Sequence, residues 1–563
     1  MKSIKSIILV FCIASLTLII NSCSNDDTAI KDPRRYTASD IKSYSDLFEV
    51  FWTTMDQRYN YFFEQKEISG LDWDKVYKDY KPKFEALKTY GRSTENDQDI
   101  YNDYLKAKDY FSEIVNPIID RHFYVQISLP YTSKGIVSNV YFYGDMLNET
   151  QVNTHPFAGK FNIMSNRVNA QAFKARDITI AGNLIANPDV FYFSFSSFNL
   201  STNYNLSNLF DDYLVADAGN ALLLTEKTIT EEATFNTIQS QTLKNDLKTL
   251  CLSLINEWQT LVTTSPEAIN FRNELKAFKN TEVMREEFLT SIVQLRAKTD
   301  AFRNKLSVVA TYVNPASQSL YVAESRNFVS WFSTKMVSEH TGLGYNYSRF
   351  TNAQTLVTRS KDFYKNFLNP LHKGDIKKIV IDLRGNGGGA VLDARFISDR
   401  FVTKNTVFAY QRSKEGSGRF DYTPWVEART NPHKFGIPAN IPIVILTDRG
   451  SASMSEITTL MLKAQGNHVI SVGDYSAGAT AGLGTTDDFN GGTRDAVAGG
   501  ILNFYMPLLA MKDAAGNVVE GIGIKPDIAV EPLTDSEVSQ VNEGSSSFVD
   551  RALDKALEYL STK

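Results

Sequence analysis

The second half of the chain alternates fully apolar strands with helical stretches, and this alternation limits the possible folds more than any other feature. The apolar strands cover residues 378–383, 441–446 and 468–472, and the helical stretches cover residues 393–401 and 453–464. Strands that are apolar on both faces are typical of a parallel sheet with helices on both sides. From about residue 336 onward we therefore predict an α/β domain built on a mainly parallel sheet.

The rest of the chain is long enough for further domains, because 563 residues exceed what one hydrophobic core usually serves. Residues 37–130 carry apolar side chains at helical spacing, for example Leu47, Phe51 and Met55, and predict an N-terminal helical domain. Residues 131–335 begin with alternating strand-like stretches and continue into long amphipathic helices, so we expect a mixed α+β middle region. Residues 536–563 end in one more amphipathic helix.

The first residues have the pattern of an export signal. Lys2 and Lys5 precede an apolar stretch at residues 7–20 that is short for a membrane span. The segment ends in Ile-Asn-Ser-Cys, which resembles a bacterial lipobox whose cysteine receives the lipid. We therefore expect residues 1–22 to be a lipoprotein signal peptide, Cys23 to be lipidated, and residues 23–36 to form a polar tether. The alternative is an ordinary cleaved signal with an incidental cysteine.

Composition excludes several classes of function. The formal net charge of −5 and pI of about 5.8 give no cationic surface for nucleic acid. No His-Glu-x-x-His or clustered Cys/His spacing provides metal ligands, so we expect neither a metal mechanism nor a cofactor. The mature chain keeps Cys251, in a helical pattern where we expect it in the core.

One turn has the pattern of a nucleophile. Residues 448–456 read Asp-Arg-Gly-Ser-Ala-Ser-Met-Ser-Glu, directly after an apolar strand and before a helix. Such a turn can raise a hydroxyl above the sheet while backbone N–H groups point the same way. Ser453 is the candidate nucleophile, although these serines could simply cap the helix. Asp448 and Glu456 fit a turn residue and a first-turn helix residue better than acid-base catalysts.

A second turn, at residues 382–389, reads Asp-Leu-Arg-Gly-Asn-Gly-Gly-Gly and also follows an apolar strand. Its glycines let backbone amides approach a ligand closely. It lacks the Lys-Ser/Thr ending of a P-loop and the spacing of a dinucleotide fingerprint, so nucleotide binding is disfavoured. Arg384 is expected to brace the turn or to meet a substrate carboxylate.

These two motifs and residues 520–528, Glu-Gly-Ile-Gly-Ile-Lys-Pro-Asp-Ile, resemble in order the three signatures of the C-terminal processing peptidases, or tail-specific proteases. Residues 340–350 resemble the first strand of that family's catalytic domain, and residues 36–130 resemble the helical domain of its envelope lipoproteins. The resemblance implies a ClpP/crotonase-like catalytic domain over residues 336–535. It leaves residues 131–335 without a match, and no PDZ glycine turn can be identified there.

The resemblance assigns Ser453 as the nucleophile, but the base differs between branches of the family. The tail-specific branch uses a lysine in a Gly-Lys-Gly turn, and Ala479 stands at that place. The tricorn-core-like branch uses a histidine from the preceding domain, oriented through a glutamate near the last motif. His122 and Glu520 match those places, while Arg121 departs from the usual small residue before the histidine.

The oxyanion would be bound by the backbone N–H of Met454 and that of Gly387 or Gly388. The sequence therefore predicts a serine peptidase of the cell envelope, anchored in the membrane by lipid and acting on unfolded or short peptides. It predicts no nucleic-acid partner and does not determine the oligomeric state. The alternative is a peptide-binding or scaffolding lipoprotein that keeps the fold and has no catalytic activity. This alternative is motivated by Ala479, which stands where the tail-specific branch has its catalytic lysine.

Overall fold

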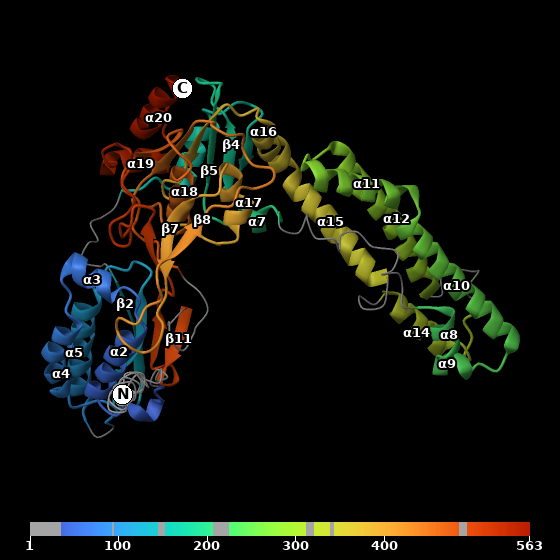
Figure 1. Cartoon of the computed structure of the whole chain (residues 1–563). Coiled ribbons are helices and arrows are strands. Elements are labelled where there is room, and N and C mark those ends of the chain that lie inside the picture. Colours follow the sequence, from blue (N-terminus) through green and yellow to red (C-terminus); the bar gives the residue numbers. More distant parts are fainter. Residues whose placement is uncertain are drawn as a thin grey trace, which may run out of the picture. The chain divides into compact units, whose positions relative to one another are not determined.

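The structure is a computed structural model that describes residues 35–92, 95–144, 153–206, 224–310, 320–337, 343–482 and 493–563 (Figure 1). The predicted signal peptide, Cys23 and all but the last two residues of the tether lie outside these ranges. The chain forms two compact units. Unit 1 comprises Met1–Val152, Val407–Arg429 and Tyr475–Lys525, and unit 2 comprises Asn153–Thr406, Thr430–Asp474 and Pro526–Lys563.

Unit 2 contains the predicted α/β domain. Its strands are β3 (Phe173–Ala175), β4 (Thr179–Asn183), β5 (Val190–Phe195), β6 (Lys378–Asp382), β9 (Ile443–Thr447), β10 (Val469–Gly473) and β14 (Ile528–Ala529). They form one sheet in the order β14-β10-β9-β6-β5-β4-β3. The five strands from β14 to β5 are parallel, and β4 and β3 are antiparallel additions. The prediction of a mainly parallel α/β sheet is confirmed.

Helices cover both faces of this sheet because its strands are apolar on both sides. Val380, Val444 and Tyr192 form one core cluster with Leu553 and Ala556 of α20 (Arg551–Ser561). On the opposite face, the ring of Phe191 stacks on Phe367 of the π-helical segment η6 (Tyr364–Leu368), and the ring of Phe193 packs against Phe367 at a tilt. The remaining helices near the sheet are α6 (Phe157–Ser165), α7 (Leu200–Asn203), α16 (Asn369–Lys373), α17 (Asp393–Phe396), η7 (Ser398–Phe401), α18 (Met454–Lys463) and α19 (Asp535–Glu543).

Between α7 and β6 the chain forms a set of helices. They are α8 (Glu226–Thr230), α9 (Ala233–Asn236), α10 (Gln241–Thr263), α11 (Pro266–Thr281), α12 (Glu286–Ala310), α14 (Arg326–Val337) and α15 (Leu343–Phe363). The long helices predicted before residue 305 are thus present, and Cys251 is buried in α10 as expected. A buried ion pair between Glu282 and Arg400 links this region to η7, with both side chains fully buried.

The strand predicted at residues 340–350 is wrong. Residues 340–342 lie outside the described residues, and the remainder begins helix α15. The buried side chains of this helix, Phe350, Ala353 and Val357, recur every three or four residues, which is the period of a helix and not of a strand. The sheet strand that lies beside β6 comes instead from β5, inside the region grouped as 131–335.

Unit 1 combines the N-terminal helices with two small antiparallel sheets. Its helices are η1 (Ala38–Asp40), α2 (Tyr44–Arg58), α3 (Phe62–Ser69), α4 (Trp73–Glu85), α5 (Asp97–Val115) and η8 (Ala498–Gly500). The sheets are β11-β12-β1-β2 and β13-β7-β8. These strands are β1 (Tyr124–Pro130), β2 (Val137–Tyr143), β7 (Val407–Arg412), β8 (Val426–Arg429), β11 (Thr493–Val497), β12 (Leu502–Tyr505) and β13 (Ala510–Asp513).

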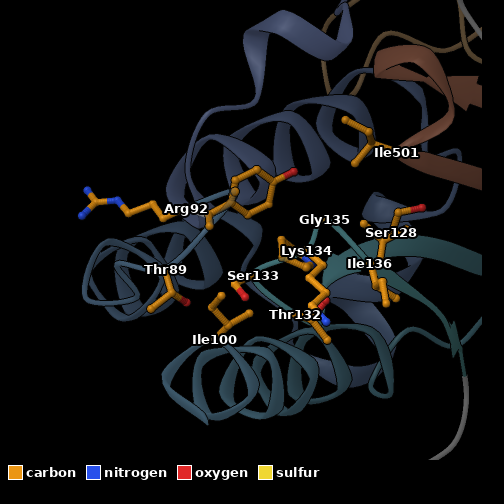
Figure 2. A pocket seen from close by; sticks show the side chains of 14 residues that line it. Thr89, Arg92, Ile100, Ser128, Thr132, Ser133, Lys134, Gly135, Ile136 and Ile501 are labelled. Carbon is orange, nitrogen blue, oxygen red and sulfur yellow. The ribbon is translucent and has the colours of Figure 1, made fainter. Parts of the chain in front are cut away.

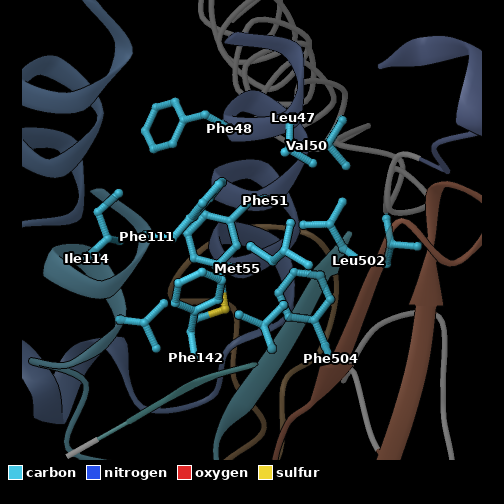
Figure 3. Packing of buried hydrophobic residues seen from close by; sticks show 14 of the residues in the cluster. Leu47, Phe48, Val50, Phe51, Met55, Phe111, Ile114, Phe142, Leu502 and Phe504 are labelled. Atoms are coloured by element: carbon cyan, nitrogen blue, oxygen red, sulfur yellow. The ribbon is translucent and has the colours of Figure 1, made fainter. Parts of the chain in front are cut away.

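The core of unit 1 explains why segments far apart in the sequence belong together. Phe51 of α2 contacts Phe111 of α5 and stacks on Phe504 of β12, and Phe142 of β2 packs on Phe111 (Figure 3). The aromatic positions at helical spacing are therefore core residues, as the sequence predicted. None of the helices in the described ranges is long and apolar enough to cross a membrane.

Candidate active site

Ser453 lies between β9 and α18, in the turn that the sequence singled out. Its backbone has φ 54° and ψ −116°, a conformation that residues other than glycine rarely adopt. Its N–H donates to Oε2 of Glu456 in the first turn of α18 (3.1 Å). Helix-capping serines normally have extended backbone angles, so capping alone does not account for this strained conformation. The geometry matches a strand-to-helix nucleophile turn.

Asp448 joins the nucleophile turn to the glycine turn. Its Oδ1 accepts hydrogen bonds from the N–H groups of Gly385 (2.8 Å) and Gly450 (2.9 Å). Its Oδ2 accepts from the N–H of His155 and lies 3.0 Å from Nδ1 of that ring. Burial raises the pKa of Asp448, but the hydrogen bond and charge of His155 outweigh it and hold the pKa below the usual value. Asp448 is therefore an ionised brace, consistent with the predicted turn residue.

Asn386 connects the same two turns from the other side. Its backbone carbonyl accepts from the N–H of Ala452 (3.1 Å) and from Oγ of Ser455 (2.7 Å). Its side-chain Nδ2 donates to the carbonyl of Phe195 at the end of β5 (2.9 Å), and its Oδ1 accepts from the N–H of Gly388 (3.0 Å). The backbone and side chain of one buried residue, Asn386, thus hold together the ends of β5, β6 and β9.

The glycine turn packs directly against Ser453. A Cβ on Gly388 would lie 2.7 Å from Cβ of Ser453 and 2.8 Å from the nitrogen of Met454, and φ of Gly388 is 93°. Only glycine fits there. The N–H of Gly388 already donates to Asn386. By contrast, the N–H groups of Gly387 and Met454 have no acceptor in the part of the chain that the structure describes. Of the two predicted glycines, Gly387 is therefore the one with a donor available for an oxyanion.

A buried ionic cluster supports the glycine turn. Arg384 makes paired hydrogen bonds to Asp382 (2.9 and 2.6 Å) and to Asp550 (2.7 and 2.8 Å), and Nη1 also lies 3.0 Å from Nε2 of His155. Arg384 is 1% exposed, so it braces the turn and does not meet a substrate. Asp550 also caps α20 by accepting from the N–H of Leu553. The C-terminal helix is thus tied to the candidate site.

Lys160 is the buried lysine of this region, and it cannot replace the missing family lysine. Its Nζ donates to Oδ1 of Asp382 (3.2 Å) and to the carbonyl of Arg384. Burial lowers the pKa of Lys160, with the Asp382 charge opposing this effect. Ala479 stands at the expected place and is buried. A lysine base is therefore not supplied at either position.

The predicted base and its partner lie together in unit 1. Ligand-forming atoms of Asp120, His122 and Glu520 all lie within 4.8 Å of one another. Glu520 is fully buried, and its carboxylate accepts from the N–H groups of Arg121 (3.2 Å), Thr480 (2.7 Å) and Ala481 (2.8 Å). Backbone donors from two segments thus anchor this carboxylate beside the imidazole.

Asp120 is the third member of this cluster. Its Oδ1 accepts from the N–H groups of His122 (2.9 Å) and Phe123 (3.2 Å). Its Oδ2 and Nδ1 of His122 are both buried without a hydrogen-bond partner among the described residues. Burial raises the pKa of Asp120 to about 7 and lowers the pKa of His122 to about 4. Near neutral pH the imidazole is therefore uncharged, as a general base must be.

Unit 1 also has a pocket of 540 Å³ that contains none of these residues. Figure 2 shows Ile136 and Ser128 on one side of it and Thr89 and Ile100 on the other. Its cationic lining residues are Arg92 and Lys134.

The sequence patterns assigned no role to Asp120, Asn386, His155 or Asp550. For Asp120 a signal was present, because it stands two residues before His122. Asn386 lies inside the glycine motif without any mark of its role. His155 and Asp550 lie far from both turns in the sequence, and only the folded sheet brings them beneath the turns.

The model of Peptidase family S41 matches residues 346–530, which span both turns and Glu520. This stretch of the chain is therefore similar to peptidase family S41. Over 173 residues the chain is 32% identical to the carboxy-terminal processing protease CtpB of Bacillus subtilis (strain 168), covering 31% of each protein. Over 165 residues it is 30% identical to the probable CtpA-like serine protease of Staphylococcus aureus (strain N315), covering 28% of each.

These matches confirm the resemblance to C-terminal processing peptidases over the matched stretch, and they span less than a third of either relative. Among solved structures, a candidate peptidase from Parabacteroides merdae ATCC 43184 aligns over 92% of this chain and 97% of its own. The TM-score is 0.45 and the sequence identity 14%.

The strain at Ser453 makes a testable prediction about stability. Glycine adopts a positive φ without steric cost, so Ser453→Gly should be more stable than Ser453→Ala by about 1 kcal/mol. Ser455 is helical, and there the order should reverse, with Ser455→Gly less stable than Ser455→Ala by about 1 kcal/mol. Urea unfolding of the four variants measures both differences. Equal stability of the two Ser453 variants would mean that this backbone is not strained.

Proposed function

We propose that the chain is a serine peptidase that hydrolyses unfolded or short peptides through an acyl-enzyme on Ser453. The observation that carries this proposal is the strained Ser453 turn packed on Gly388, within a stretch that matches the model of Peptidase family S41. In the first step Oγ of Ser453 attacks the peptide carbonyl carbon, and its proton passes to Nε2 of His122. The tetrahedral oxyanion accepts hydrogen bonds from the N–H groups of Met454 and Gly387.

The second step releases the amine, which takes the proton back from His122 and leaves the acyl group on Ser453. Water then hydrolyses the ester with His122 again as the base. The proposal requires Nε2 of His122 to reach Oγ of Ser453 in the working enzyme. The burial of Nδ1 in a ring that lies close to Asp120 and Glu520 supports this assignment, because nearby carboxylates favour a proton on the buried Nδ1 and leave the lone pair on Nε2.

The direct test is a digest of a peptide library by the wild type and by Ser453→Ala. We expect many cleaved peptides with the wild type and none with the variant, and His122→Ala should also lose cleavage. A matched variant, Ser455→Ala, should retain it, because Ser455 only donates to a backbone carbonyl. Because each step is assigned to side chains and backbone N–H groups, EDTA should not reduce cleavage.

A correctly folded wild type that cleaves no peptide would favour the binding or scaffolding alternative. Cleavage that survives Ser453→Ala would rule out this nucleophile.

The pH dependence tests the role of Asp120. His122, with its pKa of about 4, is a neutral base at any higher pH, whereas Asp120, with its pKa of about 7, becomes a carboxylate only as the pH rises through 7. An ionised Asp120 stabilises the imidazolium formed in the transition state. We therefore expect kcat/KM to rise through about pH 7, measured with EDTA present. Among the described residues, Glu520, Tyr59 and Tyr61 are further ionisable groups that interact with Asp120 or lie close to it.

Asp120→Asn should abolish the rise of kcat/KM near pH 7, so that kcat/KM decreases only near pH 4, where His122 becomes protonated. We expect kcat to be reduced on the order of 10² to 10⁴. The control is Asp103→Asn, since Asp103 also accepts two backbone N–H groups in unit 1. If kcat/KM of Asp120→Asn still rose through pH 7, ionised Asp120 would not be the group that stabilises the imidazolium.

We further propose that Cys23 carries lipid and holds the enzyme at a face of the bacterial cell envelope. Two or three acyl chains bury enough methylene groups for slow release from a membrane. Cys23→Ala should therefore leave a folded protein that no longer partitions with membranes or into detergent. Unchanged partitioning would mean that another segment anchors the chain.

A further inference from the structure

We propose that Asp120, His122 and Glu520 form a binding site for Zn²⁺, and that the bound metal switches the enzyme off by changing which nitrogen of His122 carries the proton. The inhibitory part rests on the proposed peptidase function, and the site itself does not. Two carboxylates and one imidazole meet within 4.8 Å. Two atoms bound to one tetrahedral Zn²⁺ at about 2.1 Å lie about 3.4 Å apart, so the ligand atoms would have to approach one another by up to about 1.4 Å.

Two buried atoms of this cluster have no hydrogen-bond partners in the described part of the chain. Oδ2 of Asp120 and Nδ1 of His122 are both buried and make no hydrogen bond, although a carboxylate lies beside the imidazole. Asp120 is fully buried. A buried polar atom without a partner is costly, and an ion bound between the two would satisfy both atoms at once.

The ligands are held in place before any ion binds. Oδ1 of Asp120 is fixed by two backbone N–H groups of the turn that carries His122. Glu520 is fixed by three backbone N–H groups and by the hydroxyl of Thr480 (3.2 Å). Such donors orient a ligating carboxylate and still leave it lone pairs for a metal. Only small movements of the three side chains are then needed.

The ligand types select the ion. An imidazole with two carboxylates suits Zn²⁺, which accepts mixed nitrogen and oxygen ligands in a four-coordinate site. Ca²⁺ and Mg²⁺ prefer six or more oxygen ligands, and three protein ligands including a nitrogen do not meet that need. A water molecule would complete the zinc site.

Metal binding removes the base through the chemistry of the imidazole ring. A neutral imidazole carries one N–H, and catalysis needs that proton on Nδ1 so that Nε2 can accept the proton of Ser453. When Nδ1 gives its lone pair to Zn²⁺, the ring proton resides on Nε2. Nε2 then cannot accept a second proton while the metal stays bound. The same residues that surround the base thus provide reversible inhibition without blocking the nucleophile.

Binding is measured first, independently of activity. Tag-free full chain carrying Ser453→Ala is titrated with Zn²⁺ by calorimetry, and Co²⁺ is used as a probe whose visible absorption reports a nitrogen-oxygen site. We expect His122→Gln and Asp120→Asn, each combined with Ser453→Ala, to weaken Zn²⁺ binding more than about 100-fold and to abolish the cobalt spectrum. The matched controls His468→Gln and Asp103→Asn should bind as the parent does.

Activity is measured second. Zn²⁺ at saturating concentration should abolish peptide cleavage by the wild type, and EDTA should restore it. Zinc binding that survives His122→Gln, or the absence of any binding, would overturn the site. Cleavage that continues while the site is saturated would overturn the inhibition. Zinc binding by a chain that cleaves nothing even with EDTA would support the site and contradict the peptidase instead.

Discussion

The parallel pairing of β6 with β9 is the contact on which the candidate site depends. In this register Asp382 lies opposite Leu446, so the two strands end at the same edge of the sheet and their turns emerge side by side. Open α/β sheets place ligand sites at such carboxyl edges. The glycine turn then contacts the nucleophile turn closely enough that Gly388 leaves no room for a side chain beside Ser453.

Buried charges hold this arrangement. Asp448 and Asn386 cross-link the turns, and Arg384 connects the glycine turn to Asp550 on the last helix. Removing one member of a buried ion pair typically costs about 3 to 5 kcal/mol, because the other charge remains buried. A cluster of this kind fixes geometry more than it adds stability. It also explains why the C-terminal helix, beyond the stretch matched to the family, belongs with the site.

In unit 1 the cluster around His122 differs from the charged cluster beneath the glycine turn in how its buried polar atoms are paired. The ionised groups beneath the glycine turn are paired, whereas Oδ2 of Asp120 and Nδ1 of His122 are buried without hydrogen-bond partners among the residues that the structure describes. Burial then shifts both pKa values in opposite directions and keeps the imidazole neutral. Perturbed groups of this kind are typical of sites that move protons.

Much of the α/β domain could be predicted from the sequence, because apolar strands and glycine turns are local signals. The strand at 340–350 was wrong because it was predicted only from a resemblance to the family's first catalytic-domain strand. The buried face of α15 became clear only from packing. The same limit hid His155 and Asp550, whose roles arise from contacts across hundreds of residues. Motifs led to the prediction of Ser453, His122 and Glu520 as site residues, whereas no motif indicates the strained backbone at Ser453.

The central claim is that Ser453 is an activated nucleophile, and the most direct measurement is its reaction with a serine-directed fluorophosphonate, followed by intact mass and peptide mapping. The account predicts one adduct per chain, located on Ser453, that forms at least about 100-fold more slowly in His122→Ala. An adduct on another serine, or labelling of Ser453 at the same rate without His122, would contradict it.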